Sequence, residues 1–347
     1  MYAHSGGAPL SQTSDHRCGP PPPPPTTAPG SAAAETPTGP MPRPGESRRT
    51  AGSILAWGAG QARQYSDPHY GQAIVPSPNP PPAGFVSVAA GSGHTLGLLA
   101  DGSVIAWGRN DFGQCQEPVS NPPPADFTAV ASRYHHNLAV RRDGSVVAWG
   151  HNQFRQCRVL PQIRFAAIAA GAYFSLGLRI DGVVLAWGAN DWRQCIVPSP
   201  NRGFIAIAAG GYHALALRKD GSITAWGYNG HGQCNVLAPN AGFRAIAAAD
   251  SFSVGLKTDG SVVVWGSNAS RQCNVPSPNP PPARFIAVAA GGCRSSGHVL
   301  ALKADGSLVA WGDNYYGQCN VPEPNAGFTA IAAGWCHSAA VRLHRPE

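Results

Sequence analysis

A Trp-Gly dipeptide recurs along the chain at nearly constant intervals, and this repetition is the strongest constraint on the fold. Each copy belongs to a longer word such as DGSVVAWGHNQFRQC (143–157). From the second copy on, a ring residue stands thirteen positions before the tryptophan and a cysteine stands eight positions after it. The seven tryptophans are Trp57, Trp107, Trp149, Trp187, Trp226, Trp265 and Trp311. Words repeated at fixed spacing indicate a repeat architecture, in which most of the recurring residues are structural.

Each repeat predicts four short β-strands. The first has the pattern F-x-A-I-A-A-G and the second H-x-L-A-L. The third, S-V-V-A-W-G, follows an Asp-Gly pair that favours a tight hairpin turn, and the fourth is Q-C-x-V-P. Four-stranded units of about forty residues are typical of propeller blades. One such sheet cannot bury both of its faces alone, whereas blades packed in a ring can.

The two ends of the repeat region are complementary halves of one unit. The chain enters its first repeat in the middle, at GSILAWG (52–58), and leaves its last in the middle, at FTAIAAGWCHSAAVRLH (328–344). The sequence therefore predicts an all-β, seven-bladed propeller over residues 51–347, in which residues 51–57 pair with about 337–343 and close the ring. Residues 1–50, which include the run Pro20–Pro25, predict a disordered, proline-rich tail.

Three of the repeated words resemble those of the RCC1-like repeat family. They are H-[ST]-L-A-L, D-G-x-V-x-x-W-G and N-x-x-G-Q, which stand here at His94–Leu98, Asp101–Gly108 and Asn110–Gln114. A cysteine replaces the leucine that ends the last word in the family. The chain is similar to bacterial RCC1-repeat proteins and to the secreted β-lactamase-inhibitor proteins of this family. The resemblance implies a seven-bladed propeller that grips a partner with aromatic residues on the loops of one face.

Most of the repeated polar residues are interpreted as structural. Ala73 occupies the cysteine position of the first repeat, so that position needs no thiol chemistry, and we expect the six repeat cysteines to be reduced and buried. They are Cys115, Cys157, Cys195, Cys234, Cys273 and Cys319. Phe174 and Phe252 share their position with His94, His136, His213, His298 and His337, so we interpret it as a slot for a flat ring and not for imidazole chemistry.

Several classes of function lack their sequence signals. The chain has no G-x-S-x-G, H-E-x-x-H, P-loop or dinucleotide-binding motif, so we expect neither an enzyme nor a cofactor. No Cys/His spacing fits zinc, and we expect no metal. The net charge is +7, but no basic run interleaves with aromatic residues, which argues against nucleic acid as a partner. No apolar stretch has the length of a signal peptide or membrane span, so we expect no binding to membranes and take the cytoplasm as the default location, with export by a leaderless route left open. We also expect a monomer.

The variable loops of one face are the best candidates for a binding site. Strand direction places the loop before the ring residue and the loop after Trp-Gly on one face, and the Asp-Gly turns and proline-rich connectors on the other. Aromatic residues on the first face either bind a partner or only cover the core; we favour binding for the loop before the ring residue and core covering for the loop after Trp-Gly. Insertions at 58–71 and 291–298 fall on this face. The predicted partner-binding residues are Tyr65, Tyr70, Tyr134, His135, Tyr173, Trp192, Tyr212, Arg294 and Trp335.

These observations favour a non-catalytic scaffold that binds a protein partner. Guanine-nucleotide exchange on a small GTPase is one alternative, since it is the activity of the founding member of the family. That member acts through a projecting β-wedge, and no connector of this chain has the strand pattern of such a hairpin. Inhibition of a secreted enzyme such as a β-lactamase is the other alternative that the resemblance implies.

Overall fold

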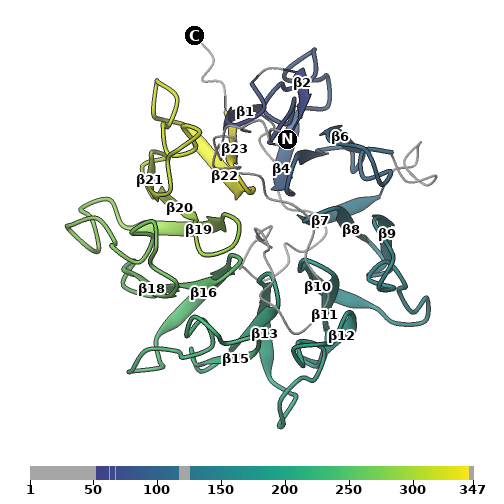
Figure 1. Ribbon diagram of the computed structural model, residues 1–347, viewed down its shortest axis with the longest axis vertical. Coiled ribbons are helices and arrows are strands. Elements are labelled where there is room, and N and C mark those ends of the chain that lie inside the picture. Colours follow the sequence, from purple (N-terminus) through teal and green to yellow (C-terminus); the bar gives the residue numbers. More distant parts are fainter. Residues whose placement is uncertain (1–51, 62, 67, 117–125, 344–347) are drawn as a thin grey trace, which may run out of the picture.

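The chain forms seven small antiparallel sheets arranged in a ring around a central axis (Figure 1). The computed structural model describes residues 52–61, 63–66, 68–116 and 126–343. Within these ranges the regular structure is all β, and no helix is long and apolar enough to cross a membrane. The fold is thus the predicted seven-bladed propeller. The predicted disordered tail, residues 1–50, lies outside the described residues.

We number the blades in chain order from the first complete one. Blade 1 comprises β4 (Phe85–Ala90), β5 (His94–Leu99) and β6 (Val104–Gly108). Blade 2 comprises β7 (Phe127–Arg133), β8 (His136–Arg141) and β9 (Val146–Gly150). Blade 3 comprises β10 (Phe165–Ala170), β11 (Phe174–Arg179) and β12 (Val184–Gly188). Blade 4 comprises β13 (Phe204–Ala209), β14 (His213–Arg218) and β15 (Ile223–Gly227). Blade 5 comprises β16 (Phe243–Ala248), β17 (Phe252–Lys257) and β18 (Val262–Gly266). Blade 6 comprises β19 (Phe285–Gly291), β20 (His298–Lys303) and β21 (Leu308–Gly312), and blade 7 comprises β22 (Phe328–Ala333), β23 (His337–Arg342) and β1 (Ser53–Gly58).

Blade 4 shows how the repeat produces this geometry. The middle strand β14 pairs antiparallel with both β13 and β15, and nearly all of it is buried. The Asp-Gly turn joins β14 to β15. There the Asp220 carboxylate accepts the backbone N–H of Ser222 at 2.9 Å, and Gly221 has a φ of +80°, which glycine adopts without strain.

The fourth segment, Q-C-x-V-P, is not a strand, which corrects the predicted four-stranded blade. Each blade has three hydrogen-bonded strands. In blade 4 the backbone N–H of Cys234 bonds to the side chain of Asn229 at 2.8 Å, and the N–H of His231 bonds to that of Gln233 at 2.9 Å. These side chains satisfy the backbone locally, so the segment folds as a compact turn and leaves no free row of groups for a sheet ladder.

An asparagine side chain takes the place of the fourth strand at the outer edge of the third. Asn240 accepts the backbone N–H of Ile223 and donates to its carbonyl oxygen, both at 2.8 Å, as a paired strand residue would. The same pair of hydrogen bonds joins Asn79 to Ile54, Asn201 to Val184, Asn279 to Val262 and Asn325 to Leu308. Each of these asparagines covers part of an otherwise exposed sheet edge.

The N-terminal strand closes the ring as predicted. β1 pairs antiparallel with β23, from Ser53 opposite Arg342 to Gly58 opposite His337. The backbones of Gly52 and Phe85 exchange two hydrogen bonds of 2.9 Å, which join blade 7 to blade 1. Residues from opposite ends of the chain therefore lock the propeller.

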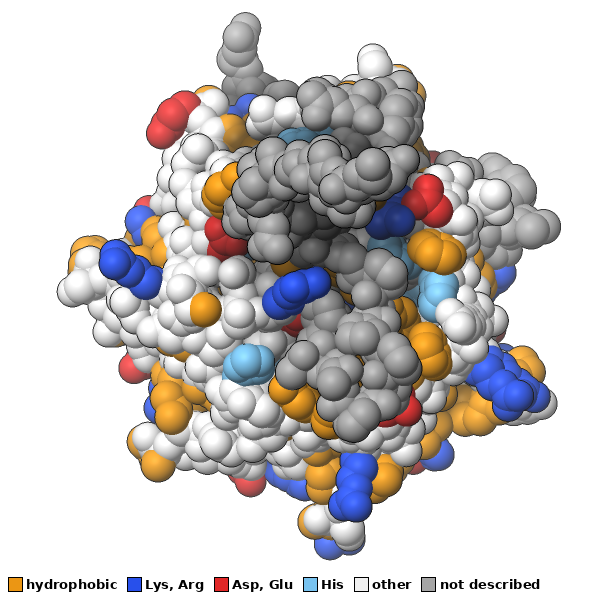
Figure 2. All heavy atoms as spheres, in the orientation of Figure 1, with side chains coloured by type: hydrophobic (Ala, Val, Ile, Leu, Met, Phe, Trp, Pro, Cys, Tyr) orange, Lys and Arg blue, Asp and Glu red, His pale blue; other side chains and the backbone are white. Residues whose placement is uncertain are grey.

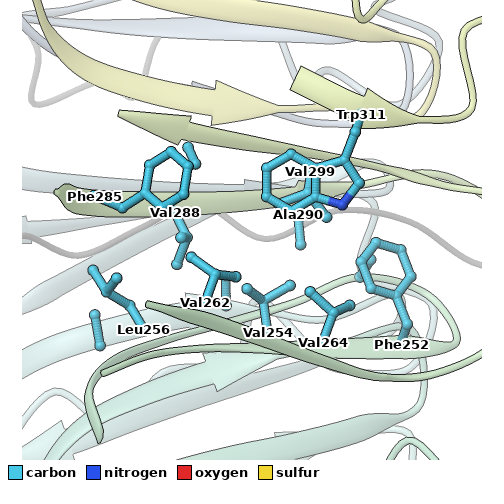
Figure 3. Packing of buried hydrophobic residues seen from close by; sticks show 14 residues of the cluster. Phe252, Val254, Leu256, Val262, Val264, Phe285, Val288, Ala290, Val299 and Trp311 are labelled. Carbon is cyan, nitrogen blue, oxygen red and sulfur yellow. The ribbon is translucent and has the colours of Figure 1, made fainter. Parts of the chain in front are cut away.

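The hydrophobic core lies between neighbouring blades. Figure 3 shows one such layer, in which Val254 and Val264 of blade 5 face Val288 and Trp311 of blade 6. Similar clusters lie at the other blade interfaces. Burying apolar side chains at each interface stabilises the ring as a whole, since no blade can bury its faces alone.

The insertion after Trp57 forms a small hairpin of its own. β2 (Arg63–Ser66) pairs with β3 (His69–Tyr70) as a separate two-stranded sheet. The sequence showed no strand pattern for a projecting β-wedge in any connector, and whether this short strand pair acts as one stays a prediction. The segment RQYSDPHY lacks the alternation of apolar and polar residues that identifies a strand in a sequence.

Candidate protein-binding face

The loops between the first and second strands and the loops after each Trp-Gly pair lie at one end of the blades, which we call the loop face. Its centre is a cluster of rings from blades 2, 3, 4 and 7, namely Tyr134, Tyr173, Tyr212 and Trp335. The ring of Tyr134 lies 4.7 Å from that of Tyr173 and 5.1 Å from that of Trp335. Edge-to-face packing of this kind stabilises the centre of the face.

The central rings are buried. Tyr134 is 2%, Trp335 3%, and Tyr173 and Tyr212 7% exposed. Burial raises the pKa of both Tyr173 and Tyr212 well above the ordinary tyrosine range. The sequence interpretation assigned these loops to partner binding. Their rings instead pack against one another, and whether they also contact a partner stays a prediction.

The exposed rings belong to the loops after Trp-Gly, where the sequence favoured core covering. Phe112 is 43%, Phe154 39% and Tyr315 71% exposed. Phe112 packs on His151 with ring centroids 4.8 Å apart, and Phe154 packs on Tyr173 at 4.9 Å. Phe112, His151 and Phe154, together with His135, form an arc of rings across blades 1 to 3 that reaches the central cluster at Tyr173. Hydrophobic and histidine side chains lie side by side over this part of the ring in Figure 2.

Of the remaining predicted residues, Trp192 packs against the central cluster, and the others have their contacts elsewhere. Tyr70 packs beneath Arg109 of blade 1, with the guanidinium carbon 4.7 Å from the ring centroid, and it helps to line a small cavity against Trp107. Trp192 is half-buried against Tyr228, with centroids 4.8 Å apart. Arg294 is exposed, and its carbonyl oxygen accepts the Ser251 hydroxyl of blade 5 at 2.6 Å. The side chain of Tyr65 lies outside the described residues. The structure therefore gathers Tyr134, His135, Tyr173, Tyr212 and Trp335, with Trp192 packed against this cluster, while the contacts of Tyr70 and Arg294 are elsewhere.

The ring-slot histidines do use their imidazole chemistry, which corrects the sequence interpretation. Each is fully buried and directs its Nε2 atom at a polar side chain of the next blade. His213 reaches the Ser253 hydroxyl at 2.9 Å, and that hydroxyl donates to the carbonyl oxygen of Gln233 at 2.9 Å. The hydroxyl can then only accept from the histidine, so Nε2 carries the proton. The other pairs are His94 with Asn137, His136 with Ser175, His298 with Ser338 and His337 with Thr95.

The two phenylalanines in the ring slot face apolar partners. Phe174 packs with Ala214, and Phe252 with Val299, at the positions that hold serine, threonine or asparagine opposite histidine. Ring and partner thus change together along the chain. Burial lowers the pKa of His213, His298 and His337 to about 3 and that of His94 to about 4, so these imidazoles are neutral in the folded protein. They are structural links between blades.

The six repeat cysteines are free thiols but are only half-buried, which corrects the expected full burial. Each lies in the turn that replaces the fourth strand, at the outer side of its blade. The Cys234 thiol contacts the carbonyl oxygen of Tyr228 at 3.4 Å, and the Cys115 thiol that of Arg109 at 3.0 Å. Burial raises the pKa of both to about 12, so neither is a thiolate at neutral pH. Within the described ranges no group of three or more His, Cys, Asp or Glu side chains could hold a metal ion.

The comparison with solved structures gives the fold of similar proteins. Prp20p from Saccharomyces cerevisiae, described with its binding to Gsp1p and histones, has a TM-score of 0.69 and 21% identity, covering 86% of this chain and 93% of its own. The same yeast RCC1 protein (Prp20) bound by Kap60 gives a TM-score of 0.67, 21% identity, and 85% and 90% coverage. Human WBSCR16 gives a TM-score of 0.64 and 18% identity, with 85% of this chain and 100% of that one covered. A search of curated protein sequences returned no significant match.

A family model identifies the repeat directly. The model of the regulator of chromosome condensation (RCC1) repeat matches residues 85–114, 127–156, 165–191, 204–233, 243–272 and 285–318. Each match starts at the phenylalanine that opens a blade, and most extend to the glutamine of its turn. The chain therefore belongs to the family of RCC1-repeat proteins.

Proposed function

We propose that this propeller is a non-catalytic module that binds a protein partner through its loop face. The arc of exposed rings carries the proposal. Phe112 and Phe154 present apolar surface to solvent next to buried aromatic neighbours, which is the anatomy of an interface with a preformed anchor site. Aromatic rings held by their neighbours lose little conformational entropy on binding.

The relatives support a role in protein binding. Prp20p is described with its binding to Gsp1p and histones, and yeast RCC1 was solved with Kap60 bound. All of these ligands of a similar propeller are proteins. A sequence identity of 21% to Prp20p does not identify the partner of this chain.

The test compares exposed side chains on opposite faces of the propeller. The double variant Phe112→Ala/Phe154→Ala removes the exposed rings of the loop face, and Ile180→Lys in the Asp-Gly turn of blade 3, 79% exposed, is the matched control. With the full chain as bait, the wild type and the Ile180 variant should capture the same partners. The double variant should bind these partners at least about tenfold more weakly than the wild type does. Loss of capture by the Ile180 variant alone would assign binding to the turn face and contradict the proposal.

The β2–β3 hairpin favours nucleotide exchange as a second candidate function. It is a short strand pair outside the blades, in the insertion that follows Trp57. Release of labelled GDP from a panel of small GTPases tests it. Catalytic amounts of the chain should accelerate release, and a chain that leaves every release rate unchanged does not exchange nucleotide on that panel. Inhibition of a secreted enzyme such as a β-lactamase stays a prediction of the resemblance.

A further inference from the structure

The outer edge of blade 2 lacks the asparagine that covers the corresponding edge of five other blades. In blades 3 to 6 this asparagine stands seventeen residues after the first residue of the third strand and bonds to both backbone groups of that residue. The third strand of blade 2 is β9, and the residue seventeen positions after Val146 is Ile163. An isoleucine side chain has no polar group, so it cannot make these bonds.

The start of β9 is less buried than its equivalents. Val146 and Ala148 are both half-buried. The equivalents of Val146 in the other six blades are at most 4% exposed, namely Ile54, Val104, Val184, Ile223, Val262 and Leu308. The connector of blade 2 also presents apolar surface, since Leu160 is 57% exposed. Where the asparagine is missing, the edge of the sheet is thus open to solvent.

The backbone of β9 offers hydrogen-bonding groups along this open edge. β9 pairs with β8 on its inner side, and its other side faces away from the axis of the ring (Figure 1). Alternate residues of an antiparallel strand direct their N–H and C=O groups away from the partner strand. The N–H of Arg141 bonds to the carbonyl oxygen of Ser145, so the outward residues are Val146 and Ala148. Within the described residues no hydrogen bond satisfies their outward groups.

Basic side chains flank the same edge. Arg155 and Arg158 lie in the turn that follows β9, and both are exposed. The salt bridges found in the described ranges include neither of them, whereas Asp143 at the other end of the strand contacts Arg164 at 3.6 Å. Arg158 also replaces an asparagine that bonds back to the turn in three other blades, namely Asn235, Asn274 and Asn320. The uncompensated charge beside this edge is therefore positive.

We propose that the outer edge of β9 binds an extended, acidic segment of a partner protein, which adds a fourth strand to blade 2. The backbone of the segment pairs with Val146 and Ala148, as peptides do when they extend a sheet at an exposed edge. Leu160 contacts its apolar side chains, and the two arginines attract its acidic residues. The site lies at the outer side of the blade. It goes beyond the proposed function of the loop face and does not depend on it.

Two other occupants suit this edge less well. The tail of residues 1–50 is rich in proline, which has no N–H to donate to a sheet, and its four arginines outnumber its three acidic residues. A second copy of the chain would bring its own Arg155 and Arg158 to the same edge, so that like charges would meet. An acidic strand matches both the backbone groups and the charge.

The probe is a fluorescein-labelled peptide, Glu-Glu-Val-Thr-Val-Thr-Val-Glu, titrated with the full chain at low salt and followed by fluorescence anisotropy. We expect saturable binding with a dissociation constant of about 100 µM or tighter. The peptide should also slow hydrogen exchange of the Val146 and Ala148 amides, as measured by NMR. A peptide with lysine in place of each glutamate should bind at least about tenfold more weakly.

Variants of the edge separate strand addition from other modes of binding. Ile163→Asn introduces the asparagine that covers the other blades, and Ala148→Pro removes an outward N–H without removing a bond to β8. Both should weaken binding at least about tenfold, whereas Ile163→Ala, the matched control, leaves the edge open and should bind as the wild type does.

Four results would overturn the proposal. The first is a wild-type chain without saturable binding, and the second is equal binding of the lysine peptide. The third is a wild-type dimer in sedimentation that Ile163→Asn dissociates, which would assign the edge to a second copy. The fourth is slow exchange of the Val146 amide in the dilute chain without peptide, which would assign the edge to a segment of this chain.

Discussion

The pairing of His213 with Ser253 predicts that two changes which each destabilise the propeller are nearly harmless together. Ser253→Ala removes the acceptor at 2.9 Å from Nε2 and leaves a fully buried N–H without a partner. That loss should lower the free energy of unfolding by about 1–3 kcal/mol. His213→Phe is milder, because the Ser253 hydroxyl keeps its bond to Gln233 at 2.9 Å. We expect it to cost about 1 kcal/mol.

The double variant His213→Phe/Ser253→Ala reproduces a combination that the chain already uses. Phe174 opposite Ala214 and Phe252 opposite Val299 fill the same slot at two other interfaces, and all four residues are buried. The phenylalanine should therefore fit, with no buried polar atom left over. The coupling between the two changes should be about 2–4 kcal/mol, nearly the sum of the two single costs, towards compensation.

Urea unfolding followed by tryptophan fluorescence, at constant temperature near neutral pH, measures all four members of this cycle. Phe174→His, which creates an unmatched imidazole opposite Ala214, is the reverse control and should destabilise the protein. If the costs of the two single changes simply add in the double variant, the hydrogen bond contributes no coupling, and a matched ring and partner do not stabilise the interface.

Four other measurements test the rest of the architecture. The five ring-slot histidines have pKa values of about 3 to 4 in the folded state against 6.5 ordinarily, so the unfolded chain binds more protons below about pH 6.5 and stability falls with acid. Summed over the five histidines, the free energy of unfolding should fall by about 6 kcal/mol between about pH 7 and about pH 5.5. A urea midpoint that stays constant over this range would contradict this expectation. Deleting residues 52–73 removes β1 and should cause aggregation, whereas deleting 1–48 should leave the melting temperature unchanged, as a thermal melt will show. Trp335→Ala should cost about 3–5 kcal/mol in urea unfolding, because the ring is only 3% exposed. Cys234→Ala should cost about 1 kcal/mol or less, and its thiol should react with a thiol reagent much faster in denaturant than in the folded protein.

The fold was predictable because the repeat is long and its spacing is rigid. Trp-Gly marks the end of the third strand in every blade, and the half-repeats at the two ends require β1 to pair with β23. The fourth strand was mispredicted because Q-C-x-V has the composition of a strand. Side-chain hydrogen bonds from Asn229 and Gln233, which no periodicity reveals, fold it as a turn.

The candidate site was less predictable, because burial at the centre of a ring depends on all blades at once. Tyr134 and Trp335 come from blades 2 and 7, and no local pattern shows that their rings meet. Arg133 could have been singled out, since an arginine stands where six other blades carry glycine or alanine. What its side chain reaches, Ala209 and Ala248, depends on how the first strands of blades 2, 4 and 5 are spaced around the ring, which the sequence does not show.

The polar links between blades divide the ring into interfaces of two kinds. Five interfaces carry a buried histidine bonded to the next blade, and the interfaces of blade 3 with 4 and of blade 5 with 6 carry phenylalanine and apolar partners. The closing interface is of the first kind, where His337 meets Thr95 at 3.0 Å across the junction of the chain ends. Acid therefore weakens the closing interface, at which the N-terminal strand β1 completes the blade of the C-terminal strand β23. The two apolar interfaces have no imidazole to protonate. Opening in acid should begin where the chain ends meet, because there the loss of a polar link coincides with the smallest covalent constraint.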